Sequence, residues 1–78
     1  MTQTALNWPV TRQESLTKRE SQVAFWIAQG KTNREIAIIL TVRPRTIEKH
    51  VENVLRKLHV ENRTTAALLL VHRSGENA

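Results

Sequence analysis

The sequence predicts an all-α fold, a compact four-helix domain with a central helix-turn-helix. Apolar residues recur at spacings of three and four, as on one face of a helix. Two capping-box sequences, which begin at Thr17 and Thr32, mark helix starts. No useful length of chain alternates between apolar and polar residues as a strand does. The 78 residues suffice for one domain with a small core, and we expect an arm or linker over 1–15, the domain over 16–74 and a tail over 75–78.

The first helix is expected to begin after Thr17, because its hydroxyl can accept from the third helical amide while Glu20 reaches back. Gly30 should end this helix, since glycine adopts the left-handed conformation without a Cβ clash. In the preceding arm, Pro9 disfavours helix at Trp8, and we expect Trp8 to fold back onto the domain. The predicted inner face of the helix carries Val23, Trp26 and Ile27.

Two helices separated by a short break follow. The Thr32 capping box opens a short helix, and Thr41-Val42-Arg43 interrupts the pattern. Pro44 suits the first position of the next helix, where its missing N–H would be unpaired in any case. We expect that helix over about 44–58. Its predicted buried stripe is Ile47, Val51, Val54, Leu55 and Leu58, and the shorter helix turns Ile36, Ala37 and Leu40 inward.

The fourth helix should begin near Asn62, a favourable N-cap, and run to about His72, with Ser74-Gly75 ending it. Its spacing turns Ala66, Leu69 and Leu70 inward. An apolar outer stripe on a small domain often marks an interface, although scattered surface aliphatic residues would give the same pattern. The predicted dimer interface is Thr64, Ala67, Leu68 and Val71.

The charge of the chain favours a polyanionic partner. Its formal net charge is +5, and seven basic residues against three acidic ones lie between Lys31 and Lys57. Such a balance is typical of proteins that bind DNA, RNA or an anionic membrane surface, although an ordinary solvated surface can carry it too.

The central pair of helices has the size and order of a helix-turn-helix, whose second helix lies in the DNA major groove. Arginine or lysine can donate to guanine O6 and N7, and glutamate can accept from cytosine N4. The N-terminal amides at Asn33 and Arg34 could bind a phosphate. A plain helical bundle that binds protein would share this periodicity. The predicted base-contacting residues, on the outer face of the third helix, are Arg45, Glu48, Lys49 and Glu52.

Many positions resemble the LuxR-type (GerE-type) helix-turn-helix family, which also forms the DNA-binding domain of NarL/FixJ-type response regulators. The resemblance covers about residues 16–72 without a gap. The residues that carry it include Leu16, Thr17, Arg19, Glu20, Val23, Ala28, Gly30, Asn33, Glu35, Ile36, Ala37, Leu40, Thr46, Ile47, His50, Asn53, Lys57, Leu58, Val60, Arg63 and Ala66.

The resemblance implies a transcription regulator, or the effector domain of one, that binds double-stranded DNA as a homodimer through its fourth helix. An upstream receiver or sensor domain could carry the regulatory switch. No cofactor is implied. This resemblance, the helix N-termini and the basic charge together predict contacts to the DNA backbone from Thr32, Asn33, Arg34, Arg43, Thr46, Asn53, Arg56 and Lys57.

Three positions depart from the family pattern. Arg43 stands where many members have a capping Ser or Thr, so we expect it to reach a phosphate. Glu48 replaces a common lysine, so base preference cannot be carried over from the family. Phe25 occupies a position that is usually polar, which suggests that Trp8 or a partner domain covers it.

Several classes of function are disfavoured. The chain has no cysteine, and His50, His59 and His72 lack metal-ligand spacing. No nucleophile–base pair, phosphate loop or cofactor motif indicates an enzyme. No apolar run reaches the roughly 18 residues of a membrane span, and no secretory signal is visible, so we expect a cytoplasmic protein. The alternative is a protein-interaction module that kept the fold and lost DNA binding, because Glu48 and Glu52 oppose the phosphate field.

Overall fold

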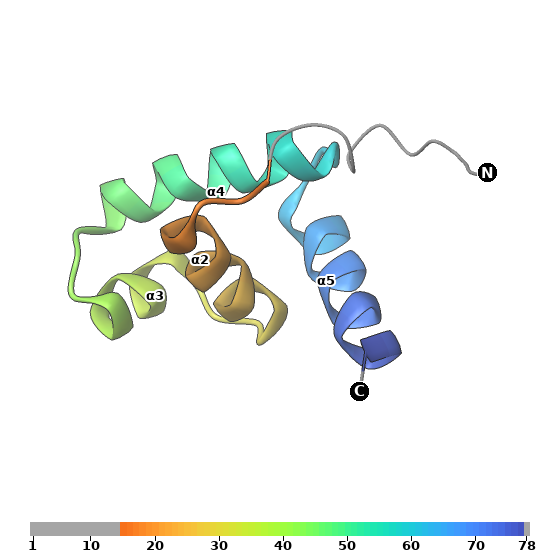
Figure 1. The fold of residues 1–78 in the computed structure, drawn as a ribbon. Coiled ribbons are helices and arrows are strands. Elements are labelled where there is room, and N and C mark those ends of the chain that lie inside the picture. Colours follow the sequence, from red (N-terminus) through yellow and green to blue (C-terminus); the bar gives the residue numbers. More distant parts are fainter. Residues whose placement is uncertain (1–14, 78) are drawn as a thin grey trace.

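The structure, a computed structural model, describes the backbone of residues 15–77 and the side chains of residues 15–72. The predicted arm over 1–15, apart from Ser15, and the predicted contact of Trp8 lie outside these residues. The described chain forms four helices and no strand: α2 (Lys18–Ala28), α3 (Asn33–Leu40), α4 (Pro44–Leu58) and α5 (Arg63–Asn77). Figure 1 shows α4 along one side of the molecule, with α2 beneath it and α3 and α5 on opposite sides of α2. The predicted all-α fold is confirmed.

Both predicted capping boxes form. The Glu20 amide donates to Thr17 Oγ1 at 3.1 Å, and the Thr17 amide donates back to Glu20 Oε1 at 2.9 Å. The same pair of bonds links Thr32 and Glu35, at 3.1 and 2.8 Å. Each box satisfies a helical amide that would otherwise lack an acceptor, and so fixes where α2 and α3 begin.

The other two helices start in the predicted way as well. Pro44 is the first residue of α4, and Arg43, which precedes it, makes no capping bond with its side chain. At α5, the Thr65 amide donates to Asn62 Oδ1 at 2.8 Å, as expected for an asparagine N-cap.

Three helices end in left-handed residues. Gly30 has φ +83° after α2, and the amide of Lys31 donates to Trp26 O at 3.0 Å, which closes the last turn. Thr41 and His59, at φ 60° and 59°, end α3 and α4 in the same way. A side chain with a Cβ is strained in this conformation, so the tight reversal between α3 and α4 carries a conformational cost at Thr41.

The predicted end of α5 at Ser74-Gly75 is wrong, because the helix continues to Asn77. A glycine permits the left-handed conformation without requiring it, and within a helix it costs only about 1 kcal/mol relative to alanine. No proline follows it to force the backbone out of the helix.

The core lies where all four helices meet. The largest fully buried side chains are Val23 and Ile27 of α2, Ile36 of α3, and Ile47 and Val54 of α4, each at most 1% exposed. Val51, Leu58 and the predicted α5 residue Ala66 are also buried, and Leu55, Leu69 and Leu70 pack against the core. The predicted inner faces are therefore confirmed, and α4 is held rigidly by its buried stripe.

The outer side of α5 carries an exposed apolar stripe, as predicted, but the stripe contains fewer residues than expected. Leu68 is 68% exposed and Val71 51% exposed, and Thr64 is exposed beside them. Ala67 was placed in this stripe, yet it is half-buried and packs against the core. Ala67 lies about 60° around the helix from Thr64 at 100° per residue, which turns its short side chain partly toward the domain.

No helix within residues 15–77 has the length and apolar character needed to cross a membrane.

Candidate nucleic-acid interface

The α3–α4 unit consists of a short helix, the three residues Thr41-Val42-Arg43 and a longer helix. The amide of Val42 donates to Ala37 O at 3.0 Å, and the amide of Ile47 donates to Arg43 O at 3.2 Å. The backbone of the reversal is thus bonded on both sides. The unit can present α4 as a fixed body, which recognition of a rigid duplex requires.

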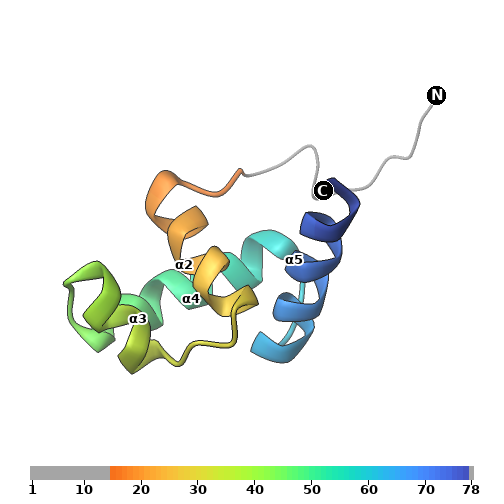
Figure 2. The same cartoon turned by 90° about the horizontal axis from the view of Figure 1, so that it is seen from below.

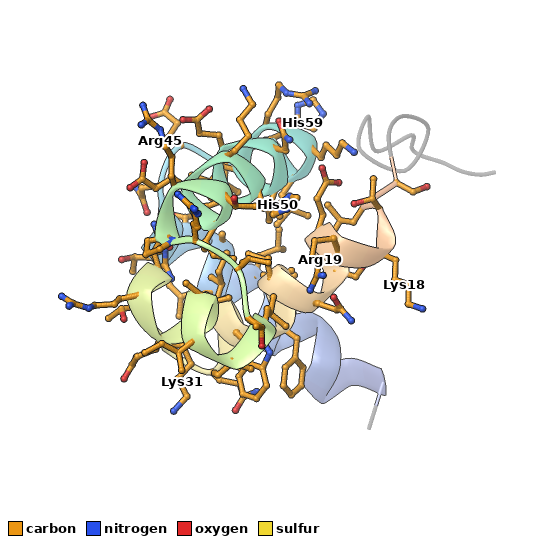
Figure 3. The ribbon with its side chains drawn as sticks, turned by 90° about the vertical axis from the view of Figure 1, so that its left-hand side faces the viewer. Lys18, Arg19, Lys31, Arg45, His50 and His59 are labelled. Carbon is orange, nitrogen blue, oxygen red and sulfur yellow. The ribbon has the colours of Figure 1, made fainter. Side chains whose placement is uncertain are left out.

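One face of α4 is charged and fully open to solvent. Arg45, Glu48, Lys49 and Glu52, the four predicted base contacts, are all exposed. The opposite face holds the buried stripe of Ile47, Val51 and Val54. Figure 3 shows Arg45 pointing outward near the start of α4 and His50 pointing inward toward the other helices. The structure therefore brings these four residues together on one accessible surface.

The charges on this face interact weakly with one another. Lys49 Nζ lies 3.9 Å from Glu52 Oε1, and their side chains are 72% and 70% exposed. An ion pair this long and exposed contributes little to stability, so either partner can leave it for a ligand at small cost.

Polar side chains at the starts of α3 and α4 are exposed as well. Thr32 and Arg34 at the start of α3, and Arg43 and Thr46 at the start of α4, are exposed. Further along α4, Arg56 Nη2 donates to Asn53 Oδ1 at 3.4 Å. Five of the eight predicted backbone contacts are thus exposed and Asn53 is half-buried. Asn33 and Lys57 have protein partners.

The Lys57 side chain lies between α2 and α4 and is largely buried. Its Nζ donates to Glu20 Oε1 at 2.7 Å and to Ser15 O at 3.3 Å, and its side chain is only 13% exposed. This ion pair joins α2 to α4. We therefore correct the predicted role of Lys57: its ammonium is held by a buried carboxylate and is not presented to a phosphate.

The electrostatics of Glu20 support this structural role. Burial raises the pKa of the Glu20 carboxyl. The hydrogen bonds from Lys57 Nζ and the Thr17 amide, together with the positive charge of Lys57, lower this pKa by more than burial raises it. The net pKa lies below its ordinary value, so Glu20 is ionised and paired at neutral pH.

Arg63 has a role that sequence reasoning missed. Its guanidinium donates from Nη1 to Asn33 Oδ1 and from Nη2 to Lys31 O, both at 2.5 Å. These bonds join the first residue of α5 to the segment between α2 and α3. Burial lowers the pKa of Arg63 without deprotonating it. A signal was available, because a cation in the first turn of a helix opposes the helix dipole and so calls for a compensating contact.

His50 has one unsatisfied atom. Its Nδ1 is buried and has no hydrogen-bond partner within the described residues. No group of three or more His, Asp and Glu side chains within the described residues could hold a metal ion.

Phe25 is 54% exposed and packs edge-on against Trp26, with ring centroids 4.8 Å apart and planes at 83°. The predicted cover by Trp8 falls on residues outside the described chain. Ile38 and Ile39 on α3 are also exposed, at 75% and 42%.

Comparisons with known proteins place this geometry in a family. The family model of bacterial regulatory proteins of the luxR family matches residues 14–70. Similar proteins include the transcriptional regulatory protein LiaR of Bacillus subtilis, 48% identical over 61 residues. The nitrate/nitrite response regulator protein NarP of Escherichia coli is 40% identical over 60 residues. The quorum sensing-dependent transcriptional regulator RpaR of Rhodopseudomonas palustris is 46% identical over 55 residues.

These alignments cover 78%, 77% and 70% of this chain, but only 28%, 28% and 23% of the respective relatives. The chain therefore spans about a quarter of the length of the curated relatives it matches. The family match covers α2, α3 and α4 and about half of α5. This chain belongs to the LuxR family of bacterial regulatory proteins, as its sequence predicts, and is a transcription-regulator domain of that family.

Proposed function

We propose that this domain binds double-stranded DNA sequence-specifically, with α4 lying in the major groove. The observation that carries the proposal is the exposed face of Arg45, Glu48, Lys49 and Glu52 on a helix whose other side is locked in the core. A groove of about 12 Å admits such a helix, and its side chains can then reach the base edges. The domain contributes binding and no chemistry of its own.

Each residue of this face has a distinct proposed task. Arg45 and Lys49 donate to guanine O6 and N7, and Glu48 and Glu52 accept from cytosine N4. The two carboxylates also repel phosphates, so they weaken binding to DNA that does not offer them a cytosine. The net effect of the glutamates is selectivity at the expense of nonspecific affinity.

Contacts to the sugar-phosphate backbone would fix the register of α4 on the duplex. At the start of α3, the amides of Asn33 and Arg34 have no intrahelical acceptor and suit a phosphate oxygen. The proposed backbone contacts are Thr32, Asn33, Arg34, Arg43, Thr46, Asn53 and Arg56.

A homodimer through α5 completes the proposed complex. Leu68 and Val71 present an exposed apolar strip that a second copy would cover. Two copies could then place two α4 helices on half-sites of one duplex. A receiver or sensor domain joined upstream would control this assembly, in keeping with the similarity to NarP, a response regulator, and to RpaR, a quorum sensing-dependent regulator. Such a regulator would act in the bacterial cytoplasm.

The proposal is tested by titrating salt against binding to a random duplex, followed by fluorescence anisotropy. Contacts to several phosphates release counterions, so the logarithm of the affinity should fall linearly with the logarithm of salt concentration, with a slope of about −0.9 per phosphate contacted. A protein-interaction module, favoured by Glu48 and Glu52, would show no binding even at low salt. That result would reject the DNA-binding proposal.

A further inference from the structure

We infer that Arg63 is a positioning residue for DNA binding, which fixes the side-chain amide of Asn33 so that its NH₂ group is presented to a phosphate. This inference rests on the proposed function and adds to it a contact made by α5. Arg63 does not itself touch DNA in this account. It acts through Asn33, the first residue of α3.

Arg63 bridges parts of the chain that are distant in sequence. Arg63 Nη1 bonds Asn33 Oδ1, and Nη2 bonds Lys31 O, across 30 and 32 residues of sequence. Figure 2 shows the segment between α2 and α3 running alongside the first turn of α5. The planar guanidinium can hold two acceptors at once in a fixed fork, so Asn33 and the backbone at Lys31 are held as one unit.

The chemistry of the guanidinium decides which end of the Asn33 amide faces it. Arginine only donates hydrogen bonds, so the atom bonded to it must be the carbonyl oxygen of Asn33. The NH₂ group is therefore turned away from Arg63. Asn33 is half-buried. Within the described residues its Nδ2 donates to no acceptor, and Nδ2 is not among the atoms that are buried without a partner. It is therefore accessible to a ligand. A donor in that position suits an anion and not a cation.

The surroundings of Asn33 favour a phosphate as its acceptor. The neighbouring backbone amides of Asn33 and Arg34 begin α3, at the positive end of the helix dipole. The Glu35 carboxylate accepts from the Thr32 amide at 2.8 Å, and the amides of Asn33 and Arg34 have no intrahelical acceptor. In this proposal, Nδ2 and these two backbone amides are the donors offered to a phosphate. Without Arg63, the Asn33 amide could rotate and offer its oxygen, which would repel that phosphate.

A double-mutant cycle on DNA affinity tests the inference. Specific binding of a duplex selected from a random pool is measured for the wild type, Asn33→Ala, Arg63→Met and the double variant, at a temperature well below every melting midpoint. A hydrogen bond to a charged group is lost in each single variant, so each should weaken binding about tenfold or more. In the Asn33→Ala background, Arg63→Met should cost less than about threefold, since the group it positions is absent.

The controls separate positioning from charge and from stability. Arg63→Met removes a positive charge in both backgrounds, so the effect of lost charge cancels in the cycle. Arg19→Met, on α2 and away from the proposed DNA interface, measures how much the loss of one positive charge alone weakens binding. If Arg63→Met does not fold, Arg63→Lys takes its place, because lysine keeps the charge but cannot hold both acceptors in a fork.

Two results would overturn the inference. An equal loss of affinity from Arg63→Met in both backgrounds would show that Arg63 supports the fold alone. Normal binding by Asn33→Ala would show that the amide makes no DNA contact, while the proposed function would stand. By contrast, failure of the wild type to bind any duplex at low salt would reject both the proposed function and the role of Arg63.

Discussion

Two basic side chains of this domain, Lys57 and Arg63, bond to residues far away in sequence. Lys57 pairs with Glu20 at the boundary between α2 and α4, and Arg63 bonds Asn33 and Lys31. Both are at least partly buried and have defined acceptors. The basic side chains of the domain are therefore of two kinds. Some, such as Lys57 and Arg63, stabilise the fold, and others remain exposed on the proposed DNA-binding surface.

The Glu20–Lys57 pair predicts how stability depends on pH. The pKa of Glu20 in the folded state lies below its unfolded value of about 4.3. Its contribution is therefore fully present above about pH 5 and is lost as the pH falls through the folded pKa. Denaturant unfolding at pH 7 and at pH 3 should show a smaller loss of stability in Glu20→Gln than in the wild type.

The exposed carboxyl of Glu35 provides the matched control for this measurement. Its pKa is also lowered, first by the hydrogen bond from the Thr32 amide, but Glu35 is exposed and solvent screens its interactions. Glu35→Gln should change the pH dependence less than Glu20→Gln does. The same acid sensitivity in wild type and Glu20→Gln would contradict the role given to the buried pair.

At the scale of the element, α4 connects the core to the proposed DNA contact. Its buried stripe holds it against α2, α3 and α5, while its opposite face stays open. The direction in which α4 leaves α3 is set by the reversal at Thr41, a β-branched residue at φ 60°. Packing of the core thus maintains the α3–α4 arrangement, even though Thr41 is poorly suited to the left-handed conformation that the turn requires.

Replacing Thr41 with glycine should stabilise the domain. A left-handed conformation costs a residue with a Cβ about 1–2 kcal/mol, while glycine adds a smaller entropic cost in the unfolded chain. Thr41 is exposed, so little packing is lost. We expect Thr41→Gly to raise the unfolding free energy by roughly 1 kcal/mol in urea titrations.

Thr65, an exposed threonine in the first turn of α5, offers the comparison. Thr65→Gly should destabilise slightly, since glycine is the poorer helix former. Equal destabilisation by both substitutions would mean that the turn at Thr41 is not strained.

At the scale of the whole molecule, α3 and α5 lie on opposite sides of α2 (Figures 1 and 2), and the α5 side chains of Leu68 and Val71 are exposed. A second copy could therefore cover α5 without blocking the exposed face of α4. Leu68→Glu should prevent two copies from assembling on one duplex, because burying an unpaired carboxylate is costly. Leu68 is 68% exposed, so the fold should be retained.

Analytical ultracentrifugation of the complex with a selected duplex measures this directly. The wild type should sediment with two copies per duplex and Leu68→Glu with one. Ile38→Glu, at a 75% exposed position on α3, should leave the two-copy complex intact. A two-copy complex of Leu68→Glu would remove α5 from the proposed interface.

The sequence was sufficient for the features that depend on local spacing. The capping boxes, Pro44 at the first position of α4, the N-cap at Asn62 and the inner face of α4 each involve residues within a few positions of one another, and all are confirmed. The misplaced residues depend on tertiary contacts. The family resemblance predicted a DNA contact for Lys57. Its actual partner Glu20 is 37 residues away, and the distance between the two is set only when α2 packs on α4.

The central claim is that the exposed face of α4 distinguishes DNA sequences. We would measure the affinity of the wild type and of Lys49→Ala for a duplex selected from a random pool and for a scrambled duplex of equal length and composition. Loss of a bidentate base contact should weaken specific binding by roughly 1–3 kcal/mol and reduce discrimination between the two duplexes. Unchanged discrimination by Lys49→Ala, with affinity lowered equally for both duplexes, would contradict the account.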